Sequence, residues 1–234
     1  MQQHRTMELM DDPALQTDEH FHALRGLDRI NRLSMVKSCL WRPLATLQKE
    51  LRRPISVLDV ATGSGQWPID LYFIAKEHGV ELTIAGCDIS PRAIERASQR
   101  AGDLGARVTF SVHDVLAAPL PKYDVVTCSL FLHHLDRTNA AELLRRMKAA
   151  ANALILIEDL QRSVPGMILA WVVPPLISTS RVVRVDARRS VRAAYTAHEA
   201  LQLGHEAGLA GATVRRHWPC RYLLQWRRAD GDTR

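Results

Sequence analysis

Short apolar runs alternate with helical patterns from residue 55 onward. Runs typical of buried strands occur at residues 55–60, 82–87, 107–112, 123–129 and 153–158. Apolar residues at helical spacing fill the intervals, at residues 67–78, 91–101 and 138–150. This alternation predicts right-handed crossover units on a parallel α/β sheet.

The N-terminal part lacks strand patterns. Residues 1–17 are polar and mixed, which favours a frayed terminus, and helical patterns follow to about residue 51, with a bend or restart near Pro43. We therefore predict a helical cap at residues 1–52 ahead of a main domain at residues 53–234.

The C-terminal part returns to regular patterns. Thr196 and Glu199 have the spacing of a capping box, which predicts a helix that Gly208 closes. Two β-like runs, at residues 212–217 and 221–227, predict an antiparallel hairpin.

An insertion at residues 160–190 interrupts the α/β rhythm. Its first half, residues 164–177, is apolar and contains Trp171, but it is shorter than the ~20 residues of a membrane span and carries three prolines. It is interpreted as a lid over an apolar substrate or as ordinary core. Its second half is basic, and could meet an acidic substrate or lipid headgroups in transient membrane-surface contact, or form a solvated face. The arginines are Arg181, Arg184, Arg188, Arg189 and Arg192.

Composition restricts the class of protein. A chain of 234 residues, 47% hydrophobic and 24% charged, has room for one sizeable α/β domain. The net charge of +6 permits nucleic-acid binding, but no basic block interrupts the pattern, so a nucleic-acid partner is not expected. The four scattered cysteines show no disulfide or metal spacing, and the N-terminus shows no signal-peptide pattern. These features indicate a cytoplasmic protein with reduced thiols.

Residues 57–67 read Val-Leu-Asp-Val-Ala-Thr-Gly-Ser-Gly-Gln-Trp and carry the clearest chemical signal. Gly63 and Gly65 follow a predicted strand and permit a tight turn with close backbone approach to a ligand. A dinucleotide fingerprint would place a third glycine at Pro68, which disfavours a nicotinamide oxidoreductase.

The spacing Asp59-x-Ala61-x-Gly63-x-Gly65 resembles the first motif of class I S-adenosylmethionine (SAM) methyltransferases. Alanine in the first glycine slot is similar to the ubiquinone/menaquinone-type members. The resemblance implies a Rossmann-like α/β sheet of roughly seven strands with an antiparallel last strand. It also implies SAM as cofactor and S-adenosylhomocysteine (SAH) as product.

Three acids, Asp59, Asp88 and Asp114, follow successive predicted strands and should lie along one sheet edge. The resemblance implies that Asp88 binds the ribose hydroxyls and that the acid after the third strand reaches the adenine amino group. Backbone at the end of the fourth strand would meet the methionine part. The implied cofactor residues are Asp59, Ala61, Thr62, Gly63, Gly65, Asp88, Ile89, Asp114, Val115, Ser129 and Leu130.

His133 and His134 follow the fourth predicted strand. His134 falls on the histidine of a similar Glu-His loop in quinone-type methyltransferases, which makes it the candidate base for a phenol or enol. The alternative is a histidine that only bonds backbone or packs on the cofactor. Glu158 and Asp159 could form part of a magnesium site, but Ser129 stands where metal-dependent relatives have an acid. No metal is therefore expected.

A weaker resemblance links the His-His-Leu segment, the insertion and the C-terminal residues Trp218, Arg221 and Trp226 to methyltransferases associated with type III polyketide synthases. The expected reaction is O-methylation of a small, largely apolar phenolic, polyketide or quinone-type compound. The alternatives are a methyltransferase acting on carbon, nitrogen or a macromolecule, and a non-catalytic SAM- or RNA-binding module. The sequence specifies neither the acceptor nor the oligomeric state.

Overall fold

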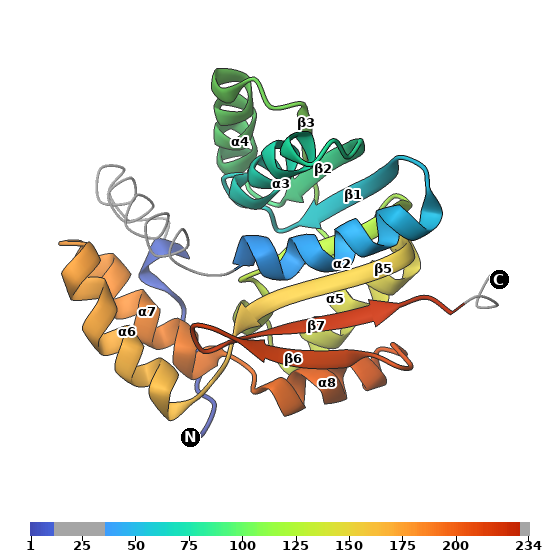
Figure 1. Ribbon diagram of the computed structural model, residues 1–234. Helices are drawn as coiled ribbons and strands as arrows, with labels where there is room; N and C mark the ends of the chain where they lie inside the picture. Colours follow the sequence, from blue (N-terminus) through green and yellow to red (C-terminus); the bar gives the residue numbers. More distant parts are fainter. Residues whose placement is uncertain (12–35, 230–234) are drawn as a thin grey trace.

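The computed structural model describes residues 1–11 and 36–229, and its centre is a seven-stranded sheet (Figure 1). The strand order is β3-β2-β1-β4-β5-β7-β6. The strands are β1 (Ile55–Val60), β2 (Leu82–Asp88), β3 (Val108–Val112), β4 (Tyr123–Ser129), β5 (Ala151–Leu160), β6 (Thr213–His217) and β7 (Arg221–Arg227).

Strands β1 to β5 are parallel, whereas β7 runs antiparallel to β5 and to β6. The predicted Rossmann-like sheet with an antiparallel last strand is confirmed. The chain passes from β1 outward to β3 and then returns to β4 on the other side of β1. Ligands of open α/β sheets bind at such a switch point, outside the carboxyl ends of the strands.

Helices cover both faces of the sheet, as Figure 1 shows. They are α2 (Val36–Leu51), α3 (Gln66–Glu77), α4 (Pro91–Leu104), α5 (Arg137–Ala150), α6 (Val164–Ile177), α7 (Arg181–Ala193) and α8 (Ala197–Glu206), with short 3₁₀ turns η1 (Leu9–Asp11) and η2 (Leu132–His134). Val57 belongs to a core cluster that includes residues of α2 and α3, and its neighbour Leu58 belongs to a second cluster that includes residues of α5 and α8. Both faces of β1 are buried, which explains its continuous apolar run.

The helix starts follow the local sequence signals. Ser90 accepts a hydrogen bond from the Ala93 N–H and Pro91 is the first residue of α4, as predicted. Thr196 and Glu199 form the predicted capping box of α8. The insertion folds as two helices, α6 and α7, which pack against each other and extend beyond one end of the sheet (Figure 1).

The N-terminal region differs from the expectation in two respects. Residues 1–11 are not frayed: the Gln3 side chain donates to the Ala193 carbonyl at 2.7 Å, and the His4 N–H to the Arg192 carbonyl at 3.1 Å. Helix α2 contains Pro43 without a break and contributes three buried leucines to the core of the main sheet. The predicted helix ahead of α2 lies outside the described residues, and the cap at residues 1–52 stays a prediction.

Among the described residues, none of the helices has both the length and the apolar character that a bilayer crossing requires.

Two glycines in the loop after β1 provide a matched test of packing at the sheet edge. Both have positive φ, so alanine at either costs about 1–2 kcal/mol in backbone strain. An added Cβ at Gly63 meets no atom within 4 Å, whereas at Gly65 it lies 2.7 Å from the Phe110 ring. Gly65→Ala should therefore lower the free energy of unfolding by about 1–3 kcal/mol more than Gly63→Ala.

Urea unfolding of both variants measures this difference. Equal losses of stability would contradict the packing of Phe110 against the glycine loop.

Candidate active site

The loop after β1 is fastened to the end of β2. The Thr62 N–H donates to the Cys87 carbonyl at 3.0 Å, and the Gly63 N–H donates to Asp88 Oδ2 at 2.9 Å. Ala61 has φ +53°, a left-handed conformation that is strained for a residue with a Cβ. Strain of this kind gathers at ligand-binding sites, where the surrounding structure maintains it.

Asp59 lies beneath this loop as a buried carboxyl group. Thr127 Oγ1 on β4 donates to its Oδ1 at 2.7 Å. Burial raises the pKa of Asp59 to about 7; the hydrogen bond from Thr127 opposes the rise, and the charge of Asp88 adds to it. Asp59 is therefore only partly ionised near neutral pH.

Asp88 ends β2 with its carboxylate between two backbone donors. Besides the Gly63 N–H at Oδ2, the Ser90 N–H donates to Oδ1 at 2.9 Å. A carboxylate can accept about four hydrogen bonds, so these two leave capacity for a ligand. The adjacent Ile89 side chain is 64% exposed.

Asp114 is occupied differently from Asp88. Its Oδ1 accepts the N–H groups of Leu116 and Ala117 at 2.8 and 3.2 Å, which closes the turn after β3. The side chain of Val115 is buried in the core. The His113 N–H donates to the Asp88 carbonyl at 2.9 Å and joins this turn to the end of β2.

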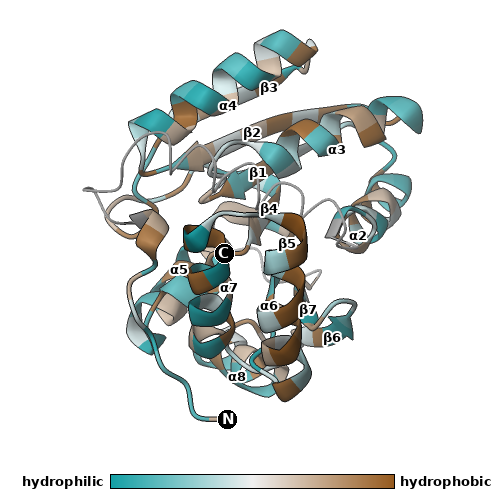
Figure 2. Ribbon diagram, turned by 90° about the vertical axis from the view of Figure 1, so that its left-hand side faces the viewer, coloured by the Kyte–Doolittle hydropathy of each residue, from teal (hydrophilic) through white to brown (hydrophobic). Residues whose placement is uncertain are grey.

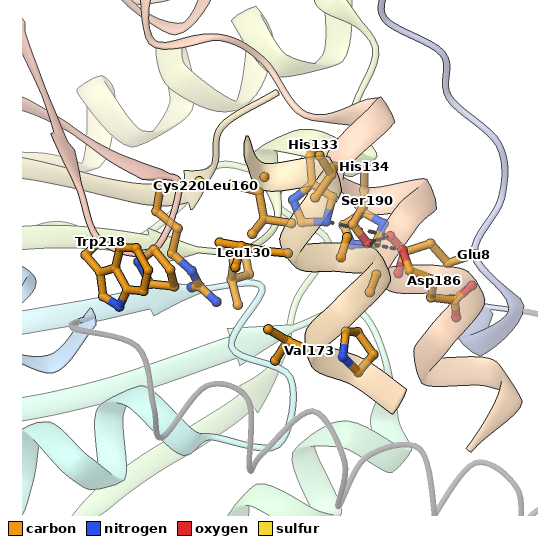
Figure 3. Close-up of a pocket in the computed structure, with 18 residues that line it drawn as sticks. Glu8, Leu130, His133, His134, Leu160, Val173, Asp186, Ser190, Trp218 and Cys220 are labelled. Atoms are coloured by element: carbon orange, nitrogen blue, oxygen red, sulfur yellow. Dashed lines mark hydrogen bonds and ion pairs between the residues drawn. The ribbon is translucent and has the colours of Figure 1, made fainter. Parts of the chain in front are cut away.

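Leu130 connects this edge of the sheet with a cavity. It follows Ser129 at the end of β4, has φ +53°, and its N–H donates to the Glu158 carbonyl at 2.9 Å. Its side chain lines a cavity of about 370 Å³ (Figure 3). Leu130 and His134 line the same cavity. The sequence predicts that Leu130 contacts the cofactor and that His134 acts on the acceptor.

The cavity is enclosed mainly by apolar side chains from α6, α7 and the turn between β6 and β7. Its apolar wall consists of Leu130, Leu160, Gly166, Leu169, Ala170, Val173, Pro174, Ala187, Val191, Trp218, Pro219 and Cys220. Its polar wall consists of Glu8, His133, His134, Asp186, Ser190 and Arg221. Such a lining selects an apolar molecule that carries a few polar atoms.

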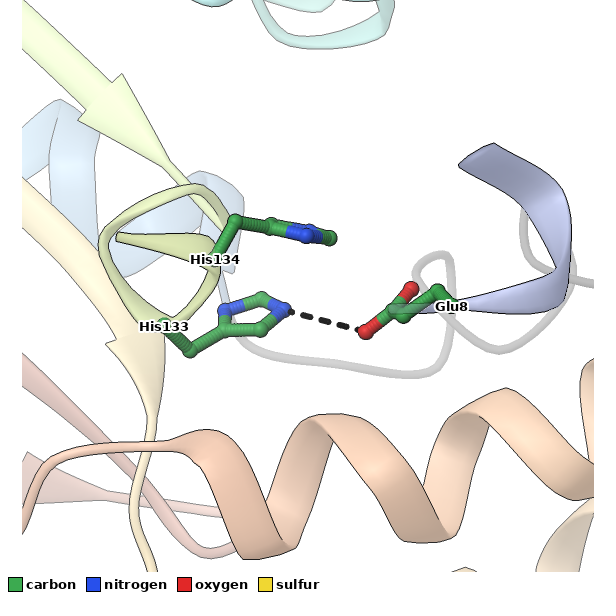
Figure 4. Close-up of side chains that lie close together, drawn as sticks. All are labelled: Glu8, His133 and His134. Carbon is green, nitrogen blue, oxygen red and sulfur yellow. Dashed lines mark ion pairs between the residues drawn. The ribbon is translucent and has the colours of Figure 1, made fainter. Parts of the chain in front are cut away.

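His133 is held from two sides by carboxylates. Its Nδ1 lies 2.6 Å from Asp159 Oδ1, its backbone N–H donates to Asp159 Oδ2 at 3.1 Å, and its Nε2 lies 3.7 Å from Glu8 Oε1 (Figure 4). Burial alone would lower the pKa of His133. The charge and hydrogen bond of Asp159 and the charge of Glu8 outweigh burial, so the pKa of His133 is raised above its ordinary value. The same contacts outweigh burial and lower the pKa of Asp159.

His134 has the opposite tendency. Its ring centroid lies 4.3 Å from that of His133, at the mouth of the cavity, where the side chain remains partly open to solvent. Desolvation by the surrounding protein and the neighbouring charge of His133 lower the pKa of His134 below 6.5. The pKa values of the two adjacent imidazoles are therefore shifted in opposite directions.

Helix α7 brings Glu8 to this position. Asp186 Oδ1 and Oδ2 accept the N–H groups of Leu9 and Met10 at 2.8 and 3.0 Å, and Ser190 Oγ donates to Glu8 Oε1. The ligand atoms of Glu8, His133 and His134 lie within 4.8 Å of one another. Two histidines and a carboxylate form a known ligand set for zinc, so these residues could hold a divalent metal.

No sequence motif indicates a role for His133, Glu8 or Asp186. Asp159 is predicted from the sequence only as a possible metal ligand. The sequence shows two adjacent histidines after β4, but it does not indicate which of the two rings contacts carboxylates. Glu8 had no signal, because it lies 125 residues before His133 and outside every motif.

Comparisons with known proteins agree with this architecture. Residues 57–153 match the family described as "Methyltransferase domain". A demethylmenaquinone methyltransferase from Deinococcus radiodurans is 33% identical over 135 residues, which cover 56% of this chain and 54% of that protein. The chain thus spans about half the length of this curated relative.

Solved structures share the fold at low sequence identity. A plantazolicin methyltransferase, BpumL, in complex with a pentazolic desmethylPZN analog and SAH has a TM-score of 0.67 at 17% identity, with 91% of each chain covered. Magnesium protoporphyrin IX methyltransferase from Synechocystis PCC 6803 with bound SAH has a TM-score of 0.59 at 17% identity, covering 91% of this chain and 98% of that one. These findings agree with the class predicted from the first motif: residues 57–153 match a methyltransferase domain, and the chain shares its fold with SAH-bound methyltransferase structures.

Proposed function

We propose that this protein transfers the methyl group of SAM to a small, largely apolar acceptor with an acidic hydroxyl, of the phenolic, polyketide or quinone type. The observation that carries the proposal is the apolar cavity beside Leu130, with two histidines of opposite charge preference on its wall. The quinone in the name of the Deinococcus relative supports an acceptor of this chemical class.

The edge formed by β1, β2 and β4 is the proposed cofactor site. The space in front of Gly63, where an added Cβ would meet no atom within 4 Å, fits a ligand that lies against the loop. Asp88 would accept the ribose hydroxyls, and exposed Ile89 would pack on the adenine. Asp114 and the backbone at Val115 would border the adenine ring. Ser129 and Leu130 would border the methionine part, next to the cavity.

The remaining loop residues have a structural task in this proposal. Asp59, Ala61, Thr62, Gly63 and Gly65 hold the loop in its left-handed turns, with its backbone turned to the ligand. SAM supplies, when bound, a methyl group already activated for transfer. The protein then aligns the acceptor with that methyl group and excludes water. The cavity walls formed by α6 and α7 would serve both purposes.

The two histidines would divide the acid–base work. His134, neutral at pH 7 because its pKa is lowered, would accept the acceptor's hydroxyl proton. His133, charged because the carboxylates of Asp159 and Glu8 raise its pKa, would stabilise the developing oxyanion. A histidine of low pKa is a weak base. The positive charge of His133 would compensate, because it stabilises the oxyanion and so makes the hydroxyl proton of the acceptor easier to remove.

The same charge assignment favours catalysis without a metal. Because a histidine must be deprotonated to bind a metal ion, a protonated His133 held by Asp159 and Glu8 would not be available as a ligand. Ser129 at the end of β4 adds no acidic ligand. The cluster of Glu8, His133 and His134 is therefore proposed to act through protons.

The cofactor assignment is tested at Asp88. Asp88→Asn removes the charge that would bind the ribose hydroxyls, and we expect the affinity for SAM to fall about 10- to 100-fold, since hydrogen bonds to charged groups contribute ~1.5–3 kcal/mol. Isothermal titration calorimetry measures the affinity. Asp103→Asn, an exposed acid on α4, is the matched control and should leave it unchanged. Undiminished affinity in Asp88→Asn would rule out the proposed ribose contact.

The division of roles is tested by the pH dependence of turnover, with methyl transfer to phenol and quinol acceptors followed by mass spectrometry. If His134 must be neutral and His133 charged, the pH profile of turnover is bell-shaped. Its acid limb lies near pH 4, where His134 becomes protonated, and its alkaline limb lies above pH 6.5, where His133 loses its proton. If His133 is the base instead, a single acid limb lies above pH 6.5.

His134→Gln should lower kcat by roughly 100-fold, the scale of general-base catalysis, and leave SAM affinity nearly unchanged. His205→Gln, an exposed histidine on α8, is the control. The assay is repeated after dialysis against a chelator, and activity lost on dialysis and restored by a divalent ion would replace the proton mechanism by a metal mechanism.

A further inference from the structure

Helix α6 is apolar on its solvent side as well as on its cavity side. Its 14 residues include no charged side chain. Leu169, Ala170 and Val173 line the cavity, whereas Ile168, Trp171 and Leu176 are 58%, 56% and 79% exposed. Figure 2 shows α6 as a mostly hydrophobic helix beside the mostly hydrophilic α7. An amphipathic surface helix would present polar residues to water. The exposed apolar face of α6 is instead suited to contact with another apolar surface.

The apolar surface continues beyond the helix. Val164 and Val172 of α6 are 63% and 52% exposed. Trp218, in the turn between β6 and β7, is 63% exposed and also lines the cavity. The exposed apolar side chains therefore reach the wall of the cavity in which the acceptor is proposed to bind.

Positive charges border this surface on the α7 side. Arg181, Arg184 and Arg188 share one face of α7, because they are spaced three and four residues apart. The Arg188 guanidinium lies 3.9 Å from the centroid of the Trp171 ring, which places that face along the outer side of α6. The only acid between residues 164 and 193 is Asp186, which is buried and accepts the N–H groups of Leu9 and Met10.

We propose that the outer face of α6, with the arginines of α7, docks the protein on an anionic lipid bilayer. Apolar side chains and a tryptophan on one helix, beside arginines with no exposed acid within residues 164–193, match the acyl boundary and the charged headgroups of such a surface. An apolar acceptor dissolved in the bilayer would then enter the cavity through the wall that α6 shares with the membrane. Docking goes beyond the proposed methyl transfer and can be tested without it.

The test is flotation of the full chain with vesicles of phosphatidylcholine alone and of equal parts phosphatidylcholine and phosphatidylglycerol. We expect binding to the mixed vesicles and much weaker binding to phosphatidylcholine. The double variant Ile168→Gln, Leu176→Gln should bind the mixed vesicles at least about tenfold more weakly. Neither residue lines the cavity, and glutamine is a good helix former, so the fold and SAM affinity should be retained.

Two further variants separate apolar from electrostatic contributions. Leu104→Gln replaces a leucine on α4 that is 51% exposed and lies away from the proposed surface, and this variant should bind like the unmodified protein. Arg184→Gln should weaken binding to the mixed vesicles about fivefold, since a basic residue near an anionic surface contributes ~1 kcal/mol. It should have little effect on binding to phosphatidylcholine.

The proposal is overturned if the unmodified protein stays unbound, or if the α6 double variant binds as well as the Leu104 variant. Sedimentation of the protein without lipid tests the other occupant of this face. Self-association that the α6 double variant abolishes, with no binding to vesicles, would assign the face to a second copy of the chain.

Discussion

The buried contact between Asp159 and His133 is the interaction on which the proposed chemistry depends. Asp159 has no exposed surface and holds both the ring and the backbone of His133, so it fixes the loop that follows β4. Its charge raises the pKa of His133, and the resulting positive charge helps to lower the pKa of His134. Asp159 thus accounts for the raised pKa of His133, whereas desolvation is the main cause of the lowered pKa of His134. A buried charge without its partner is costly, which keeps the pair together.

The end of β4 joins two regions with different physical requirements. On one side, the end of β2 offers the carboxylate of Asp88 to a polar ligand, and the loop after β1 leaves open space in front of Gly63. On the other, α6 and α7 enclose an apolar space. Leu130 lies between them, in a left-handed conformation that its N–H bond to the Glu158 carbonyl stabilises. An activated methyl group and an apolar acceptor can meet at this point because both regions reach it.

The elements that local physics controls could be predicted from the sequence. The buried strand β1, the turn with Gly63 and Gly65, and the Ser90 cap each depend on neighbouring residues, and their positions agree with the structure. The grouping of Glu8 with the histidines could not be predicted, because it depends on how residues 1–11 pack against α7. The orientation of α6 was also hidden: where every residue is apolar, periodicity cannot reveal which side faces solvent.

The proposed chemistry requires that the adjacent histidines on the cavity wall carry different charges at neutral pH. Nuclear magnetic resonance of protein labelled with ¹⁵N in its histidine rings measures this directly, with His133→Gln and His134→Gln providing the assignments. In the unmodified protein at pH 7, we expect His133 to be protonated on both ring nitrogens and His134 to be neutral. A neutral His133, or a charged His134, at that pH would contradict the proposed chemistry.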